Sequence, residues 1–167
     1  SRDLAPGLAL GPADVAVRTV PVELVPAGAL AEPAAVAGRL LVGGVRAGET
    51  LTDVRLLGPV AAVAAAGLPD AAGVPVRLAD PGVAGLLVPG ARVDIVAAGA
   101  SRAEPAAVAA EDPLPAVLAP GAVVLAVLPA PERTAAAAPV VVVALPAALA
   151  ARVATVSLRE EVTVTLR

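Results

Sequence analysis

The stretch from Gly82 to Val96, GVAGLLVPGARVDIV, constrains the fold more than any other part of the chain. Pro89 presets φ for the first central position of a β-turn, and Gly90 supplies the positive φ that a type II turn requires next. Charged and apolar residues then alternate over 92–95, as on a strand with one buried face. Sharp turns of this kind recur along the sequence, which contains 18 prolines and 15 glycines. They favour a fold built from short elements, mainly β.

Strands are predicted where apolar residues alternate with polar ones or where β-branched residues form a run. The four consecutive valines of 140–145 are typical of a strand buried on both faces. Pro120 and Gly121 predict a turn that separates two neighbouring strands. The predicted strands are 15–20, 40–45, 53–56, 74–78, 92–96, 114–119, 122–128, 140–145 and 162–166.

Three helical segments are predicted, each beginning at or after a proline, a residue that the first turn of a helix accepts. Pro33 opens a single turn that ends at Gly38, and Pro59 opens an Ala-rich segment that is either a short helix or a connector. The third follows Pro146 and has one apolar face. Its apolar residues stand at i, i+4 and i+7: Leu149, Val153 and Val156.

The residue types that are absent exclude most catalytic chemistry. The chain has no His, no Cys and no aromatic residue, and every one of its basic residues is Arg. It therefore has no Ser-His or Cys-His pair, no ordinary zinc site and no Schiff-base lysine. It has no stacking surface for single-stranded nucleic acid, and its net charge of −3 disfavours phosphate binding. We expect no enzyme activity, no cofactor, no metal and no nucleic-acid partner.

The remaining polar residues are predicted to be structural. Ser1, Ser101 and Ser157 have no base to activate them, and the acidic pairs 111–112 and 160–161 lack a third carboxylate at ligand spacing. Arginines 39, 46 and 55 could form a basic face for an anionic glycan, but the acidic residues among them favour an ordinary mixed surface. Arg92 and Asp94 are predicted to pair across a sheet.

Two long uncharged runs, 113–131 and 134–151, are interrupted by prolines, so neither is predicted to span a membrane. The chain begins at Ser1 without an initiator Met, which suggests that residues upstream were removed.

Four short motifs resemble the SAF domain. They are RDLAPG at 2–7, ADV at 13–15, GR at 38–39 and AGETL at 47–51, in the order and spacing of that family, where they mark turns of a β-clip fold. The structural residues that this resemblance implies are Asp3, Gly7, Asp14, Gly38, Arg39 and Gly48.

The stretch Gly82–Val96 resembles the GVAGLxxPGxRVDV segment of the CpaB/RcpC family, which takes part in Flp (tight-adherence) pilus assembly. VVLAV at 123–127 and the closing strand–helix–strand also fit that family. The implied structural residues here are Pro89, Gly90, Arg92 and Asp94. The two resemblances imply a mainly β fold with minor α: a SAF-like β-clip at 1–58 and a small mixed α/β domain at 59–167.

The resemblance also implies a function without catalysis. The expected protein lies in the cell envelope, outside the cytoplasm, held at the inner or plasma membrane by a helix upstream of Ser1. Its expected partners are proteins of a pilus or secretion machine, docked by exposed strands and by the loops 97–113 and 129–139. Two alternatives remain: a SAF module that binds cell-wall glycan, and an assembly chaperone like that of the flagellar P-ring. The absence of aromatic residues counts against the glycan.

Overall fold

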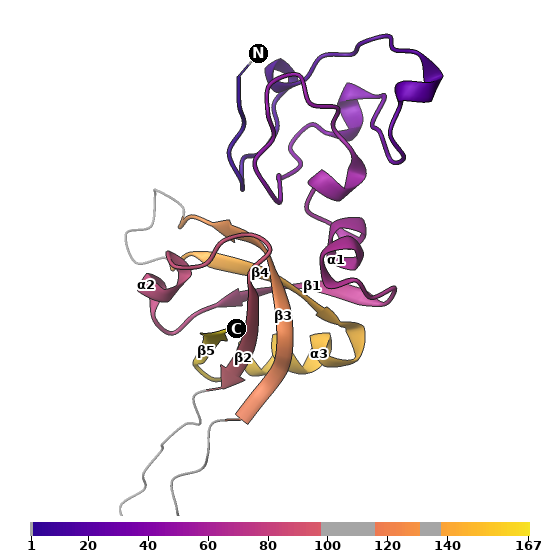
Figure 1. Ribbon diagram of the computed structural model, residues 1–167. Helices are drawn as coiled ribbons and strands as arrows, with labels where there is room; N and C mark the ends of the chain where they lie inside the picture. The colour runs from indigo at the N-terminus through magenta and orange to yellow at the C-terminus, as the bar shows by residue number, and fades with distance from the viewer. Residues whose placement is uncertain (1, 98–115, 131–137) are drawn as a thin grey trace, which may run out of the picture.

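The computed structural model describes residues 2–97, 116–130 and 138–167 (Figure 1). Over these residues the fold is mainly β: an amino-terminal region precedes a five-stranded antiparallel sheet with three short helices, which confirms the predicted fold class. Most of the loops 97–113 and 129–139, the acidic pair 111–112, Ser1 and Ser101 lie outside the described residues.

The amino-terminal region, residues 2–57, has a hydrophobic core of its own. Single paired residues join its extended segments; Leu4 and Val45, for example, exchange two backbone hydrogen bonds of 2.9 and 3.0 Å. Short 3-10 turns lie between them at Pro12–Asp14, Val22–Leu24, Pro33–Ala35 and Asp53–Arg55. The buried core residues are Leu4, Leu10, Val36, Leu41, Val45 and Leu56.

Three strands predicted in this region are absent as continuous strands. Val15 packs against the amino-terminal core, but Val17 is 65% and Val20 is 48% exposed, and no described segment pairs with 15–20. A 3-10 turn occupies Asp53–Arg55, and 40–45 contributes only single paired residues. Around 40–45 and 53–56, turns and bends every few residues leave no segment long enough to build a ladder, whereas 15–20 is long enough but has no partner strand among the described residues.

Helix α1, Pro59–Ala66, follows directly and settles the choice between a helix and a connector. Pro59 stands in the first turn, where its missing N–H breaks no helical bond. Gly67 ends the helix at φ 68°, the left-handed conformation that glycine adopts without strain. The buried Ala62 of α1 packs against the sheet.

The sheet has the strand order β1-β4-β3-β2-β5, with every neighbouring pair antiparallel. Four of its strands match predicted ones, and α2 and α3 connect β1 to β2 and β4 to β5 (Figure 1). The bounds are β1 Ala71–Arg77, α2 Pro81–Ala84, β2 Arg92–Ala97, β3 Ala116–Leu128, β4 Val140–Pro146, α3 Ala147–Val156 and β5 Val162–Leu166.

Strand β3 differs from its prediction because one strand replaces two. It runs through Pro120 and Gly121 without a break, and its pairing with β2 shifts register on either side of Ile95. Gly121 has φ 66°, which allows the strand to bend there rather than end. Neighbours on both sides pair with the two halves of β3, and this pairing overrides the local turn signal.

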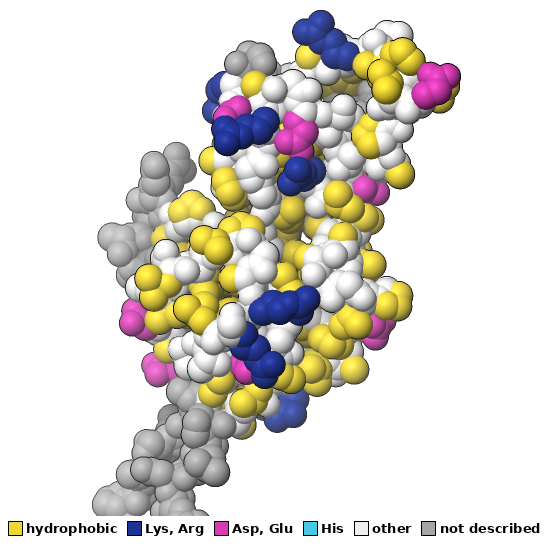
Figure 2. Space-filling model, viewed as in Figure 1, with side chains coloured by type: hydrophobic (Ala, Val, Ile, Leu, Met, Phe, Trp, Pro, Cys, Tyr) yellow, Lys and Arg dark blue, Asp and Glu magenta, His cyan; other side chains and the backbone are white. Residues whose placement is uncertain are grey.

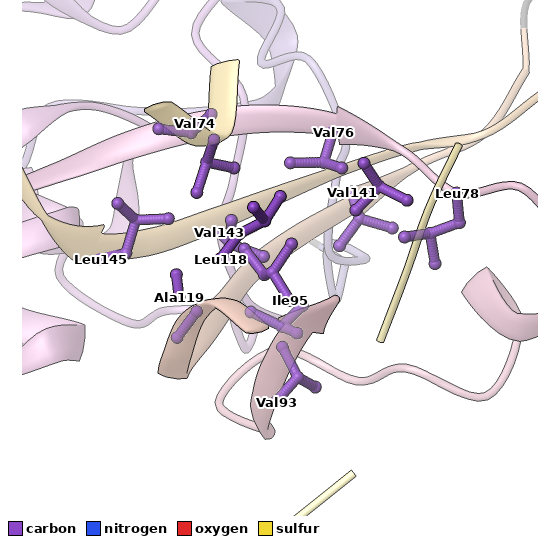
Figure 3. Close-up of a cluster of buried hydrophobic side chains, with 14 of the residues drawn as sticks. Val74, Val76, Leu78, Val93, Ile95, Leu118, Ala119, Val141, Val143 and Leu145 are labelled. Carbon is purple, nitrogen blue, oxygen red and sulfur yellow. The ribbon is translucent and has the colours of Figure 1, made fainter. Parts of the chain in front are cut away.

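The main core lies inside the curled sheet, where side chains of β1 to β4 point toward one another (Figure 3). Residues 141–145 of β4 are all buried, which confirms a strand covered on both faces. The apolar face of α3 is also confirmed: Val153 is fully buried in this core, and Leu149 and Val156 pack against it.

A second cluster covers the outer face of the sheet. There α1 packs on β1, β3 and β4, and Val42 and Leu57 of the amino-terminal region join the same cluster. At the sheet's two edges, the N–H of Ala79 donates to the C=O of Val162 at 2.8 Å, so the first and last strands meet at one point.

Candidate functional site

An apolar groove of about 560 Å³ lies where the amino-terminal region, α1 and the outer face of the sheet meet. Three parts of the chain line it: the junction into α1, the edge strand β1, and the ends of β3 and β4. No lining residue carries a polar or charged side chain. They are Leu57, Gly58, Pro59, Ala72, Gly73, Pro75, Leu125, Leu128, Val140 and Val142.

Two features shape the groove: a backbone bond at the junction and a glycine on β1. The N–H of Leu57 donates to the C=O of Leu40 at 2.7 Å, which holds the junction against the amino-terminal region. Gly73 on β1 has no side chain, and a Cβ there would stand 3.6 Å from Leu125 and 3.8 Å from Val142. A larger residue at this position would therefore project into the groove.

The groove contains no group that can transfer a proton, act as a nucleophile or ligate a metal. Its chemistry is the removal of apolar surface from water, which for one fully buried Val or Leu side chain is worth about 1.5–3 kcal/mol. Across the described parts of the chain, no cluster of three or more His, Cys, Asp or Glu residues could hold a metal ion.

The amino-terminal motif residues form local bonds away from the groove. Asp3 accepts a hydrogen bond of 3.0 Å from the N–H of Ala47 and forms an ion pair with Arg46. The backbone bond first, and then Arg46, hold the pKa of Asp3 below its usual value. The bond joins the RDL motif to the AGE motif, although 44 residues separate them.

Asp14 closes a 3-10 turn within the second motif. Its carboxylate accepts a hydrogen bond of 2.9 Å from the N–H of Gly11 and bonds Arg2 at 2.9 Å. The Gly11 bond is the main cause that lowers the pKa of Asp14, and the charge of Arg2 acts in the same direction. This aspartate organises a turn and stays ionised.

The predicted pairing of Asp94 with Arg92 is wrong, because Asp94 pairs with Arg167 instead. Its carboxylate accepts a hydrogen bond of 2.7 Å from the N–H of Gly121 and pairs with Nε of Arg167 at 2.7 Å. Arg167 reaches it because β5 lies beside β2, a neighbour that local sequence does not reveal. The Gly121 bond, followed by the Arg167 bond, lowers the pKa of Asp94.

The remaining motif residues shape turns and the junction. Arg39 donates a hydrogen bond of 3.2 Å to the C=O of Leu57, beside the groove. Pro89 and Gly90 form the expected turn before β2, with Gly90 at φ 89°. The motif glycines of the amino-terminal region, Gly7, Gly38 and Gly48, have positive φ as well.

The surface around arginines 39, 46 and 55 is mixed rather than basic. Arg46 pairs with Asp3, and Arg55 pairs with Glu49 at 2.7 Å. Figure 2 shows basic and acidic side chains side by side on this upper part of the molecule. A strongly anionic ligand would compete with these carboxylates.

Sequence reasoning missed the groove, which brings together residues far apart in the chain. Gly73 and Pro75, two residues that strands usually avoid, were its only signal.

In the ranges 2–97, 116–130 and 138–167, no helix is long and apolar enough to cross a membrane.

Comparison with known proteins identifies the first third of the chain. The family profile of the SAF domain matches residues 1–57. No curated protein matches the chain, and no solved structure does. The SAF domain is a module found in pilus-assembly proteins and in flagellar P-ring chaperones. Residues 1–57 of this chain are a SAF domain.

Proposed function

We propose that this chain is a non-enzymatic cell-envelope component of Flp-type pilus assembly, a member of the CpaB/RcpC family that binds other proteins of a pilus or secretion machine. Its SAF domain at residues 1–57 supports this role, because pilus-assembly proteins contain this module. The resemblance of Gly82–Val96 to the CpaB/RcpC segment narrows the choice among SAF proteins. The proposed location is outside the cytoplasm, at the inner or plasma membrane.

The apolar groove is the main structural evidence for the proposed binding of a protein partner. Its lining has only aliphatic side chains, glycine and proline. Aliphatic side chains of a protein segment gain free energy on entering such a groove, whereas glycan hydroxyls would lose their hydrogen bonds to water without replacement. The groove therefore favours a protein partner over a cell-wall glycan.

The state of the aspartates supports a role without catalysis. Asp3, Asp14 and Asp94 are each bonded to a backbone N–H and to an arginine, and these bonds lower their pKa values. A carboxylate with a lowered pKa is a weak base and is rarely protonated near neutral pH, so it serves poorly as a general base or acid.

The test is in-cell crosslinking of the full-length protein, followed by affinity purification and identification of the proteins that come with it. We expect pilin, platform or ATPase proteins of a pilus machine. Gly73→Glu places a carboxylate in the groove and should reduce their recovery at least about tenfold, since an unpaired charge is costly to bury. Ala64→Glu adds the same charge at an exposed position of α1 outside the groove and is the matched control.

Other outcomes would overturn parts of the proposal. Recovery that is equal for Gly73→Glu and Ala64→Glu would exclude the groove as the docking site. Recovery of no pilus protein, together with calorimetric binding of cell-wall fragments, would favour a glycan-binding SAF module. Capture of a single envelope subunit, only during its assembly, would favour a chaperone.

A further inference from the structure

Strand β5 presents one side of its backbone to β2 and the other side away from the sheet. The N–H of Arg167 donates to the C=O of Arg92 on β2 at 3.1 Å. The C=O of Val162 points the opposite way, where it accepts the bond from Ala79. Because both backbone groups of a residue lie on the same side and the sides alternate, Val164 and Leu166 face away from β2.

These outward groups form an open edge. Within the described part of the chain, the N–H and C=O of Val164 and Leu166 have no hydrogen-bond partner. Leu166 is 60% exposed, so the edge is accessible at that end. Unpaired strand edges with β-branched residues and no charge are templates for another strand.

The opposite edge of the sheet is protected by comparison. The C=O of Asp70 accepts a bond from Ala147, so by the same alternation Pro75 faces outward from β1. Proline has no N–H to offer a further strand, and α3 packs along β1. The two edges therefore differ in a way that proteins use to control edge pairing.

We infer that β5 is a self-association edge, where a second copy of this chain adds its own β5 antiparallel around a two-fold axis at Thr165. In this register Val164 of one copy lies opposite Leu166 of the other, twice. All four outward groups of each Val164–Leu166 pair form hydrogen bonds, and Thr165 lies opposite its own counterpart. The inference concerns assembly and does not depend on the proposed pilus role.

The strand sequence fits a copy of itself. The opposed pairs, Val164 with Leu166 and Thr165 with Thr165, are types that stabilise neighbouring strands. No charge lies within Val162–Leu166, and Arg167 at its end is already paired with Asp94. Ala79 occupies the position beside Val162, which blocks the register that would place Leu166 of a partner there.

The contact proposed here is small. It consists of two short strands, β5 of each copy, each five residues long. Figure 2 shows further hydrophobic side chains over α2 and the segment after it, where Leu86 and Val88 are 69% and 62% exposed. An interface of two short strands lies at the small end of the usual range, so the dimer should depend on concentration.

Sedimentation velocity of the whole 167-residue chain, from low micromolar to about millimolar concentration, tests the inference. We expect a reversible monomer–dimer equilibrium. Thr165→Glu places two carboxylates opposite each other and should raise the dissociation constant about fivefold or more. Thr165→Lys should do the same with two ammonium groups. An equimolar mixture of the two variants should restore or exceed native association, because opposite charges then meet.

Thr165→Gln is the neutral control and should associate like the native chain. Thr165 on β5 lies opposite Asp94 on β2, so Thr165→Glu also places two carboxylates close together within one copy. The free energy of unfolding of each variant is therefore measured first. Thr165→Lys does not repel Asp94. Val164→Pro removes an outward N–H that the monomer does not use and should abolish the dimer. A native chain that is monomeric at every concentration, or a Glu/Lys mixture no more associated than either variant, would overturn the inference.

Discussion

The carboxylate of Asp94 accepts a hydrogen bond of 2.7 Å from the backbone N–H of Gly121, a residue 27 positions further along the chain. Gly121 stands at the bend of β3, where the register between β2 and β3 shifts. The same carboxylate pairs with Arg167 at the end of β5. One side chain thus joins three strands, β2, β3 and β5, beside the register shift.

Removal of this carboxylate should destabilise the sheet. Asp94→Ala deprives the Gly121 N–H of its acceptor, so we expect a lower free energy of unfolding and a lower thermal midpoint. Asp94→Asn keeps an acceptor oxygen but loses the charge that pairs with Arg167. Its free energy of unfolding should therefore lie between those of the native chain and Asp94→Ala. Arg92→Ala is the matched control, because Arg92 is exposed and lies on the same strand. Equal effects of Asp94→Ala and Arg92→Ala in urea unfolding would contradict the structure.

Acid should weaken the fold through three aspartates together. Bonds in the folded state lower the pKa of Asp3, Asp14 and Asp94 below the ordinary 3.8, so the unfolded chain binds protons first. Their stabilising contribution is complete above the unfolded pKa and is lost as the pH falls below about 4 toward the folded values. Urea unfolding at a series of pH values measures this slope. A variant with all three changed to Asn should show a shallower fall; an unchanged slope would exclude these groups as its source.

The turn before β2 should depend on glycine. Gly90 has φ 89°, so Gly90→Ala forces a side chain into a left-handed conformation at a cost of about 1–2 kcal/mol in unfolding free energy. Gly85→Ala is the control, because Gly85 has φ −68° and tolerates a Cβ without this strain. Chemical denaturation compares the two. A Cβ at Gly90 would have no atom within 4 Å, so crowding is not expected to contribute. A loss for Gly85→Ala as large as that for Gly90→Ala would exclude the positive φ as the cause.

The two main hydrophobic clusters should respond separately to local damage. Leu41→Ala opens a cavity in the amino-terminal core and should cost about 2–5 kcal/mol there. Leu145→Ala should do the same in the core of the sheet. Hydrogen exchange of backbone amides, read region by region, distinguishes them. Equal loss of protection in both regions from either variant would mean that residues 2–57 and the sheet unfold as one unit.

Local patterns in the chain were enough for several elements. The valine run of β4, the apolar face of α3 around Val153 and the Pro89-Gly90 turn are all formed where they were predicted. Each depends on interactions within a few residues: β-branched side chains favour extended backbone, i and i+4 residues share a helical face, and glycine permits positive φ. The SAF motifs, spread over residues 2–51, predicted the SAF domain that the family profile finds at residues 1–57.

Contacts between distant segments account for what the sequence did not reveal. Strand β3 passes through Pro120 and Gly121 because β2 and β4 pair with its two halves. Asp94 bonds Arg167 rather than Arg92 because β5 lies beside β2. The apolar groove and the open edge of β5 also exist only once the strand order is set. The free energy of a turn or a helical face comes from residues close together in the sequence. Strand order instead depends on which of many distant segments forms the most backbone hydrogen bonds and buries the most apolar surface.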